Sequence, residues 1–309
     1  MATTQKHISV LLGAVLDALG NVQGKTIVDC TFGAGGYSRA FLERGANVIA
    51  FDRDPNVVVD ANALGGEFGN RFKFIPQPFS NIGDLEQSVD AIVFDLGISS
   101  MQIDIPERGF SFRADAPLDM RMDNREKEQR ASVCAQHSRD KKSKEQILTA
   151  AQLIESLSVA EIADILRNYG DVKKANILAR AIKDACPQTT FELRDLIHNP
   201  KDVAPVFQAL RIAVNDEMGE LERALARVPD LLVLGGKCIC VTFHSLEDRI
   251  VKNTFRTWTT APGDPRLPVV GTAPFIQIKT AVPTESELEH NPRARSAHMR
   301  GVIKNGGDA

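Results

Sequence analysis

The stretch Lys25–Asp52, KTIVDCTFGAGGYSRAFLERGANVIAFD, decides the fold. It opens with an apolar run over residues 25–30 and then enters a turn with glycines at 33, 35 and 36. The next residues have the composition of a short helix that stops near Gly45, and a second apolar run covers residues 47–52. Strand, glycine turn, helix and strand in this order are typical of a βαβ unit, which predicts a parallel sheet with helices on its faces.

The pattern continues outward from this unit. Apolar runs at residues 71–75 and 90–95 predict a third and a fourth strand. Between residues 102 and 205 no run has strand character, whereas leucine and isoleucine recur at helical spacing in its second half. Strand character returns at residues 237–243, after a helix that Pro229 breaks.

We therefore predict an α/β fold in which a Rossmann-like sheet carries an inserted small all-α domain. The sheet domain is expected at residues 1–103 and 206–309, and a helical domain that recognises the substrate at residues 104–205. Within the insertion, residues 121–145 hold 8 Lys/Arg and 5 Asp/Glu. This composition predicts a charged loop at about residues 124–148.

Composition excludes several classes of protein. The net charge of −3 excludes a polycation, so nucleic-acid binding would depend on local clusters of basic residues. No apolar run reaches the ~18–20 residues of a membrane span, and the N-terminus lacks the features of a signal peptide, which predicts a cytoplasmic protein without membrane contact. The five cysteines are scattered without a CxxC pair, so no metal site is expected.

The strongest local chemistry lies at the first strand–turn–helix. Glycines at 33, 35 and 36 let a ligand approach the backbone closely, and the helix that follows offers unpaired N–H groups. Asp52, 19 residues after Gly33, ends the second strand, where a carboxylate can accept hydrogen bonds from ribose hydroxyls. The GxGG pattern lacks the third glycine of a dinucleotide site, which disfavours NAD. S-adenosylmethionine, a nucleoside cofactor without phosphates, fits better, and Asp95 at the end of the fourth strand would lie at the same edge.

Long runs of sequence then connect this site to a known family. In chain order they are HISVLL from His7, DCTFGAGGYS from Asp29, AFDRDP from Ala50, DLGISSMQID from Asp95, ERGFSFRADAPLDMRMD from Glu107, FQALRIAVNDEM from Phe207, FHSLEDRIVK from Phe243 and NPRARSAHMR from Asn291. With these runs the chain resembles the bacterial 16S ribosomal RNA cytosine-N4 methyltransferases over nearly its whole length.

The resemblance implies a class I methyltransferase sheet, S-adenosylmethionine as cofactor, and 16S rRNA of the small ribosomal subunit as partner. The methyl group would go to the exocyclic N4 of a cytidine in the decoding centre. The family's cofactor contacts fall on Gly35, Gly36, Tyr37, Asp52, Phe79, Asp95 and Gln102. The chain departs from the family at three places: Tyr37 stands where histidine is usual, the family's YGEE stretch reads YGDV from Tyr169, and residues 124–148 are extra.

The chemistry narrows the catalytic candidates. The lone pair of an exocyclic amine is delocalised into the ring, so the enzyme must orient the amine and accept its hydrogen bonds. The acceptor would be the Asp95 carboxylate, a backbone carbonyl or Ser99, with Asp95 preferred. His244, after the last predicted strand, would contact the cytosine or a phosphate, or have a structural role.

Basic residues in the matching runs predict an RNA surface. Residues 290–304 contain Arg293, Arg295 and Arg300 and no acidic residue, and Arg108 and Arg113 would extend the surface. Two other functions stay open at this point: a non-catalytic ribosome-assembly factor that retains the cofactor pocket, and a methyltransferase acting on another nucleic acid. A homodimer also stays open.

Overall fold

The computed structural model describes residues 9–125, 147–262 and 272–306. Most of the charged loop expected at residues 124–148 therefore lies outside the described residues. The chain divides into two compact units, which we describe separately: the described parts of residues 1–97 and 220–309 form the first unit, and those of residues 98–219 form the second. None of the helices in the described part of the chain is long and apolar enough to cross a membrane.

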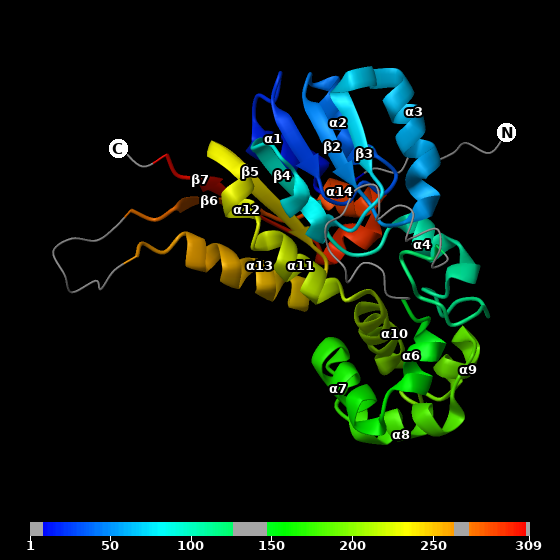
Figure 1. The fold of residues 1–309 in the computed structure, drawn as a ribbon. Coiled ribbons are helices and arrows are strands. Elements are labelled where there is room, and N and C mark those ends of the chain that lie inside the picture. The colour runs from blue at the N-terminus through cyan, green and yellow to red at the C-terminus, as the bar shows by residue number, and fades with distance from the viewer. Residues whose placement is uncertain (1–8, 126–146, 263–271, 307–309) are drawn as a thin grey trace. The chain divides into compact units, whose positions relative to one another are not determined.

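The first unit contains a seven-stranded sheet with the order β3-β2-β1-β4-β5-β7-β6 (Figure 1). Its first five strands are parallel, and β7 runs antiparallel to both β5 and β6. The predicted Rossmann-like α/β sheet is confirmed. The antiparallel β6–β7 pair, which no strand pattern predicted, extends one edge. The strands are β1 (Thr26–Asp29), β2 (Asn47–Phe51), β3 (Phe72–Ile75), β4 (Val89–Asp95), β5 (Leu232–Thr242), β6 (Phe275–Ala281) and β7 (His298–Lys304).

Helices cover this sheet, and apolar side chains from both meet in its core. Val28, Ile92 and Phe94 are fully buried in the core, together with the free thiols of Cys238 and Cys240. The helices and 3₁₀ turns are α1 (Leu12–Leu19), α2 (Gly36–Glu43), η1 (Pro55–Val57), α3 (Val58–Phe68), η2 (Gly69–Arg71), η3 (Phe79–Asp84), α11 (Glu217–Leu225), α12 (Val228–Leu231), α13 (Ser245–Trp258), α14 (Glu285–His290) and η6 (Pro292–Ser296).

The second unit is helical, as the insertion was predicted to be. Within its described residues it contains no strand, only an isolated bridge between Pro117 and Thr189. Four of its helices begin with a reciprocal capping box, as at Thr149 and Gln152, which explains where they start. The helices are α4 (Ser100–Asp104), η4 (Pro106–Arg108), α6 (Ala150–Ser156), α7 (Val159–Gly170), α8 (Ala175–Ala185), α9 (Thr190–Asp195) and α10 (Pro200–Asn215).

The unit boundaries differ from the expected ones. The units divide after residues 97 and 219, whereas the expected domain boundaries followed residues 103 and 205. The second expected boundary falls inside α10, which continues through Pro205 to Asn215. The first falls inside α4, whose capping residue Ser99 already belongs to the second unit. Both expected boundaries cut through a helix, and the observed division after residue 219 likewise falls inside α11 (Glu217–Leu225).

Candidate active site

A glycine turn joins β1 to α2 at the carboxyl edge of the sheet. Gly33 and Gly35 have φ angles of +53° and +77°, a region that side chains disfavour. A Cβ atom on Gly35 would also lie 2.9 Å from the ring of Phe32. Within the described residues no side chain caps α2 at Gly35, and the Ser38 N–H in its first turn is already bonded to Asp29, so the N–H groups of Gly36 and Tyr37 are those left for a ligand.

Asp52 follows β2 directly and contacts this turn. Its Oδ2 atom accepts a hydrogen bond of 2.8 Å from the N–H of Gly33, and its Oδ1 atom accepts one of 2.9 Å from Asp54. Burial raises the pKa of the Asp52 carboxyl to about 6, although these two N–H groups act in the opposite direction. Each oxygen retains a second lone pair, which could accept a hydrogen bond from a ribose hydroxyl.

Asp95 ends β4 at the same edge. Its N–H donates a hydrogen bond of 2.7 Å to Oγ1 of Thr31, which fixes its backbone to the end of β1. Its Oδ1 atom is buried and has no hydrogen-bond partner among the described residues. Burial, with the carboxyls of Asp29 and Glu247 nearby, raises the pKa of Asp95 well above its usual value. A buried acceptor without a donor is the feature expected where a ligand supplies the missing donor.

Asp29, the last residue of β1, is linked to Asp95 through hydrogen bonds of Thr31. Its side chain is 1% exposed and accepts hydrogen bonds from the hydroxyl of Ser38 (2.7 Å) and from the N–H of Thr31 (3.2 Å). Burial raises its pKa to about 6. Thr31 therefore connects Asp29 to Asp95, a role that the sequence analysis did not assign to it. The only signal in the sequence was its place between Asp29 and Gly33.

The side chains of the other predicted cofactor residues have partners within the protein. Tyr37 is buried, and its hydroxyl donates to the carbonyl of Val10, so a cofactor contact at this residue would involve its backbone. Phe79 begins η3, and its ring packs edge-on against Phe94 with 5.6 Å between centroids. Gln102 belongs to the second unit, where its Oε1 atom accepts a hydrogen bond of 3.1 Å from Ser99 N–H.

The two remaining catalytic candidates are helix caps. Ser99 caps α4, and its hydroxyl oxygen accepts a hydrogen bond from Gln102 N–H at 3.2 Å. His244 caps α13, and its Nδ1 atom accepts a hydrogen bond of 3.4 Å from the N–H of Glu247. The Nε2 atom of His244 lies 2.9 Å from the carboxylate of Glu247, which is itself 2% exposed. Nδ1 therefore has a structural role, whereas Nε2 is buried without a hydrogen-bond partner among the described residues, as Asp95 Oδ1 is, and stays a candidate for a substrate contact.

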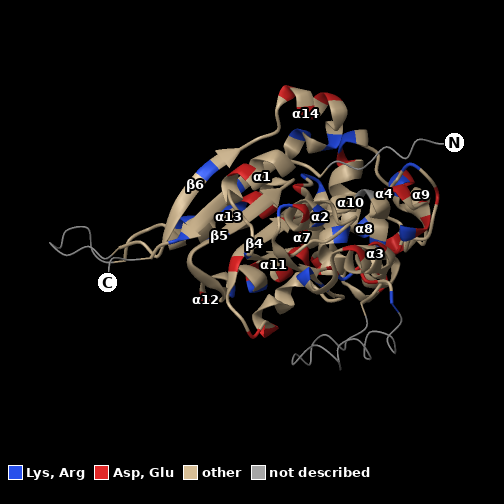
Figure 2. Cartoon of the chain, turned by 90° about the horizontal axis from the view of Figure 1, so that it is seen from above, with Lys and Arg blue, Asp and Glu red and all other residues tan. Residues whose placement is uncertain are grey.

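The five predicted RNA-binding arginines differ in their exposure and in their partners. Arg293 and Arg295 are exposed on η6, which follows α14, and Figure 2 shows basic segments beside α14. Arg300 on β7 forms a bidentate ion pair with Asp248, with distances of 2.7 and 2.8 Å. Arg113 is exposed in the second unit.

Arg108 does not fit the prediction of an RNA contact. It is 6% exposed, and its Nη2 atom donates hydrogen bonds of 2.9 Å to the carbonyls of Arg121 and Met122. The guanidinium also lies 5.7 Å from the ring centroid of Phe110. It could reach a phosphate only by leaving these partners, so the geometry supports a structural role.

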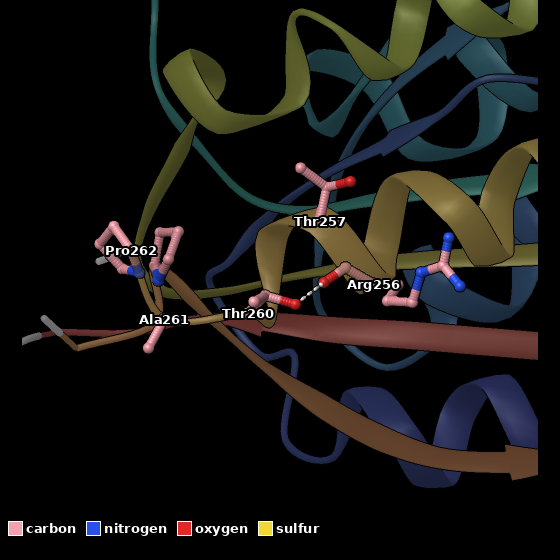
Figure 3. A pocket seen from close by; sticks show the side chains of 6 residues that line it. Arg256, Thr257, Thr260, Ala261 and Pro262 are labelled. Atoms are coloured by element: carbon pink, nitrogen blue, oxygen red, sulfur yellow. Dashed lines mark hydrogen bonds between the residues drawn. The ribbon is translucent and has the colours of Figure 1, made fainter. Parts of the chain in front are cut away.

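A hollow of about 470 Å³ lies elsewhere on the first unit (Figure 3). It is formed by the C-terminal end of α13 and the residues before β6, and none of the predicted site residues lines it. Its lining residues are Arg256, Thr257, Thr260, Ala261, Pro262 and Pro274. The hydroxyl of Thr260 donates to the carbonyl of Arg256 at 2.6 Å, which completes the last turn of the helix. Because α13 begins at His244, the hollow lies at the other end of this helix.

The chain is similar to known proteins over nearly its whole length. A sequence model described as the MraW methylase family matches residues 4–305. The chain is 42% identical to "Ribosomal RNA small subunit methyltransferase H" of Mesorhizobium japonicum over 316 residues, covering 97% of this chain and 87% of that one. It is 39% identical to the protein of the same name from Rhizorhabdus wittichii, covering 97% and 94%. A putative rRNA methylase structure from Clostridium thermocellum aligns over 97% and 98% of the two chains with a TM-score of 0.43 and 13% identity, too low to support an argument.

Proposed function

Because the chain belongs to the MraW methylase family, we propose that it transfers a methyl group from S-adenosylmethionine to the exocyclic N4 of a cytidine in the RNA of the small ribosomal subunit. The enzyme would act in the cytoplasm on a cytidine of the decoding centre, as the resemblance to the cytosine-N4 methyltransferases implies. The observation that carries the proposal within the site is the buried Asp95 Oδ1 atom, which has no partner among the described residues.

The residues present fit the cofactor. The glycine turn offers a close approach to its backbone, although the N–H groups of Gly33 and Gly35 are bonded to Asp52 and Phe32, and Asp52 beside it offers lone pairs for ribose hydroxyls. Asp95 offers a carboxyl oxygen at the same edge. Bound S-adenosylmethionine would supply a methyl group activated by a positively charged sulfur. A cation placed there would lower the raised pKa values of Asp52 and Asp95 and so favour their ionised forms.

Asp95 is the residue best suited to act on the amine. Its Oδ1 atom would accept a hydrogen bond from N4, which holds the amine with its lone pair directed at the methyl group. As N4 bonds to the methyl carbon and the bond from that carbon to sulfur breaks, releasing S-adenosylhomocysteine, the Asp95 carboxylate would stabilise the positive charge that develops on the nitrogen. The same oxygen would then take the departing N4 proton. Burial raises its pKa, which strengthens it as a base.

The other two candidates are less suited to this role. The hydroxyl oxygen of Ser99 already accepts the N–H of Gln102, and Nδ1 of His244 accepts that of Glu247. Nε2 of His244 lies 2.9 Å from the Glu247 carboxylate and has no hydrogen-bond partner among the described residues, which leaves it a contact for the base or a phosphate rather than the first choice of amine acceptor. Substrate binding would come mainly from exposed arginines. Arg293 and Arg295 on η6 are accessible to phosphates, and Arg113 offers a further contact from the second unit.

The test is methyl transfer from labelled S-adenosylmethionine to small ribosomal subunits that lack the modification, with mass mapping of the labelled nucleotide. Asp95→Asn keeps the size of the side chain but removes its charge and basicity. We expect it to lower the rate of transfer at least about a hundredfold. Asp60→Asn, a charge change at an exposed position of α3, is the matched control and should transfer at the wild-type rate.

Three outcomes would decide the proposal. Label at an N4-methylcytidine, lost only in Asp95→Asn, supports both the substrate and the role of Asp95. Label at another nucleotide would refute the proposed substrate. Wild-type protein that binds the cofactor and transfers no label would favour the non-catalytic assembly factor.

A further inference from the structure

A short segment before α1 lies against the glycine turn of the site. This strap, Ser9–Leu11, is buried, with its three residues 8%, 7% and 3% exposed. Ser9 contacts the backbone of Gly36 so closely that a Cβ atom there would lie 2.1 Å from the serine hydroxyl oxygen. The strap therefore covers the first residue of α2, which directly follows the glycine turn of the candidate cofactor site.

Two side chains from distant parts of the chain hold the strap. The hydroxyl of Tyr37, the second residue of α2, donates to the carbonyl of Val10. The carboxylate of Glu287 in α14 accepts a hydrogen bond of 2.5 Å from the N–H of Leu11, 276 residues away along the chain. Leu11 adopts a left-handed conformation with φ of +55°, which is costly for a residue with a side chain. A backbone held in this conformation depends on its anchoring contacts.

The Tyr37 hydroxyl, which holds the strap at Val10, lies near the carboxyls of the candidate site. Besides burial, the carboxyls of Asp95, Asp29 and Glu287 raise the pKa of the Tyr37 hydroxyl well above its usual value. The phenol therefore remains protonated at neutral pH and can donate only one hydrogen bond, which goes to Val10. All of these residues belong to the first unit.

We propose that Tyr37 and Glu287 are positioning residues for cofactor binding: they hold Ser9–Leu11 against Gly36, and the strap fixes the glycine turn in its binding conformation. This inference rests on the proposed function, because it assumes that the turn binds S-adenosylmethionine. It also gives a physical role to tyrosine at the position where the family usually has histidine, through the side chain rather than through a contact with the cofactor.

The test measures binding of S-adenosylhomocysteine by calorimetry, which requires no RNA. Tyr37→Phe removes only the hydroxyl and leaves the Val10 carbonyl without its donor, and Glu287→Ala leaves the Leu11 N–H without its acceptor. Each should raise the dissociation constant about tenfold. Glu287→Gln retains an oxygen acceptor and should bind within about twofold of wild type. Tyr169→Phe, which removes the hydroxyl of the chain's other tyrosine in the second unit, should bind like wild type.

Kinetics distinguish positioning from general damage to the fold. For Tyr37→Phe we expect the KM for S-adenosylmethionine to rise about tenfold, with kcat within about twofold of wild type, because the reacting groups are intact. Hydrogen exchange at residues 9–11 should also become faster in this variant.

Wild-type affinity in both Tyr37→Phe and Glu287→Ala would overturn the inference, as would equal losses in Glu287→Ala and Glu287→Gln. Failure of the proposed function looks different: wild-type protein would bind S-adenosylhomocysteine, with the expected order of variants, yet methylate no ribosomal RNA. Wild-type protein that does not bind S-adenosylhomocysteine would refute both.

Discussion

The close contact between Ser9 and Gly36 predicts that alanine at position 36 is tolerated only when the Ser9 hydroxyl is removed. Gly36 lies in α2 and has no left-handed φ, so its backbone accepts alanine, which favours a helix by about 1 kcal/mol over glycine. The obstacle is steric only. The added Cβ would lie 2.1 Å from the Ser9 hydroxyl oxygen, while the next nearest atom, Ser9 Cβ, is 3.4 Å away. Removing this one oxygen should therefore remove the clash.

We expect Gly36→Ala to lower the free energy of unfolding by about 2 kcal/mol, the usual cost of an overpacked contact. Ser9→Ala alone should change it by less than about 1 kcal/mol. The double variant should recover most of the loss, which gives a coupling energy of about 2 kcal/mol between the two positions. If the strap fixes the glycine turn, the affinity for S-adenosylhomocysteine should follow the same pattern, with about a thirtyfold loss in Gly36→Ala.

Urea unfolding and calorimetric titration of the four proteins measure both quantities. Gly35→Ala is the control: it combines a φ of +77° with a Cβ 2.9 Å from the Phe32 ring, so Ser9→Ala should not rescue it. If Gly36→Ala lowers the free energy of unfolding by the same amount with Ser9 as with Ala at position 9, the two residues do not clash as the structure predicts, and the reasoning is refuted.

Three further predictions concern charge. Burial raises the pKa of Asp29 from 3.8 to about 6, so this carboxyl stabilises the fold fully below pH 3.8 and loses that contribution as pH rises through 6. Between pH 5 and 8 the loss is about 1.4 kcal/mol in urea unfolding, and Asp29→Asn should lack it. Arg108→Ala should destabilise the protein by about 2 kcal/mol in the same assay, while RNA affinity of the folded protein stays within about twofold. Changing Arg293 and Arg295 to Ala together should reduce the slope of log affinity for RNA against log salt by about 1.5, whereas Arg256→Ala, beside the hollow of Figure 3, should leave it unchanged.

The parts of the fold that the sequence predicted are those with a strong local pattern. The strands β1, β2 and β4 are short apolar runs buried on both faces, and their composition identifies them. The edge strand β6, FIQIKTA, buries only Phe275 and lacks the apolar run by which β1 to β5 were predicted. It becomes a strand because β7 pairs with it. That pairing depends on tertiary structure and has no local signal.

The site divides in the same way. The strand pattern predicted that the glycine turn and Asp52 would share the carboxyl edge of a parallel sheet. The hydrogen bond of 2.8 Å from Gly33 N–H to Asp52 was not predicted, because it depends on how the turn closes. Arginine is usually exposed, so residue type alone predicted an accessible Arg108 that could contact RNA. In the structure its guanidinium is buried and donates hydrogen bonds to two loop carbonyls. The role of Tyr37 could not be predicted either, because its partner Val10 is 27 residues distant in the sequence.

The placement of charge explains how a chain with a net charge of −3 can act on RNA. Asp29 and Asp95 are the last residues of β1 and β4, and Asp52 directly follows β2. Burial raises the pKa of each of these carboxyls. This burial and, for Asp95, the neighbouring carboxyls of Asp29 and Glu247 disfavour the ionised form, which a sulfonium cofactor would favour. These carboxyls count fully in the net charge, yet Asp29 is buried and Asp52 and Asp95 are partly buried at the carboxyl edge of the sheet, on elements other than the η6 arginines proposed to contact RNA. The exposed Arg293 and Arg295 contribute less to the total but are placed where a phosphate could meet them, so affinity for RNA depends on the position of charge and not on its sum.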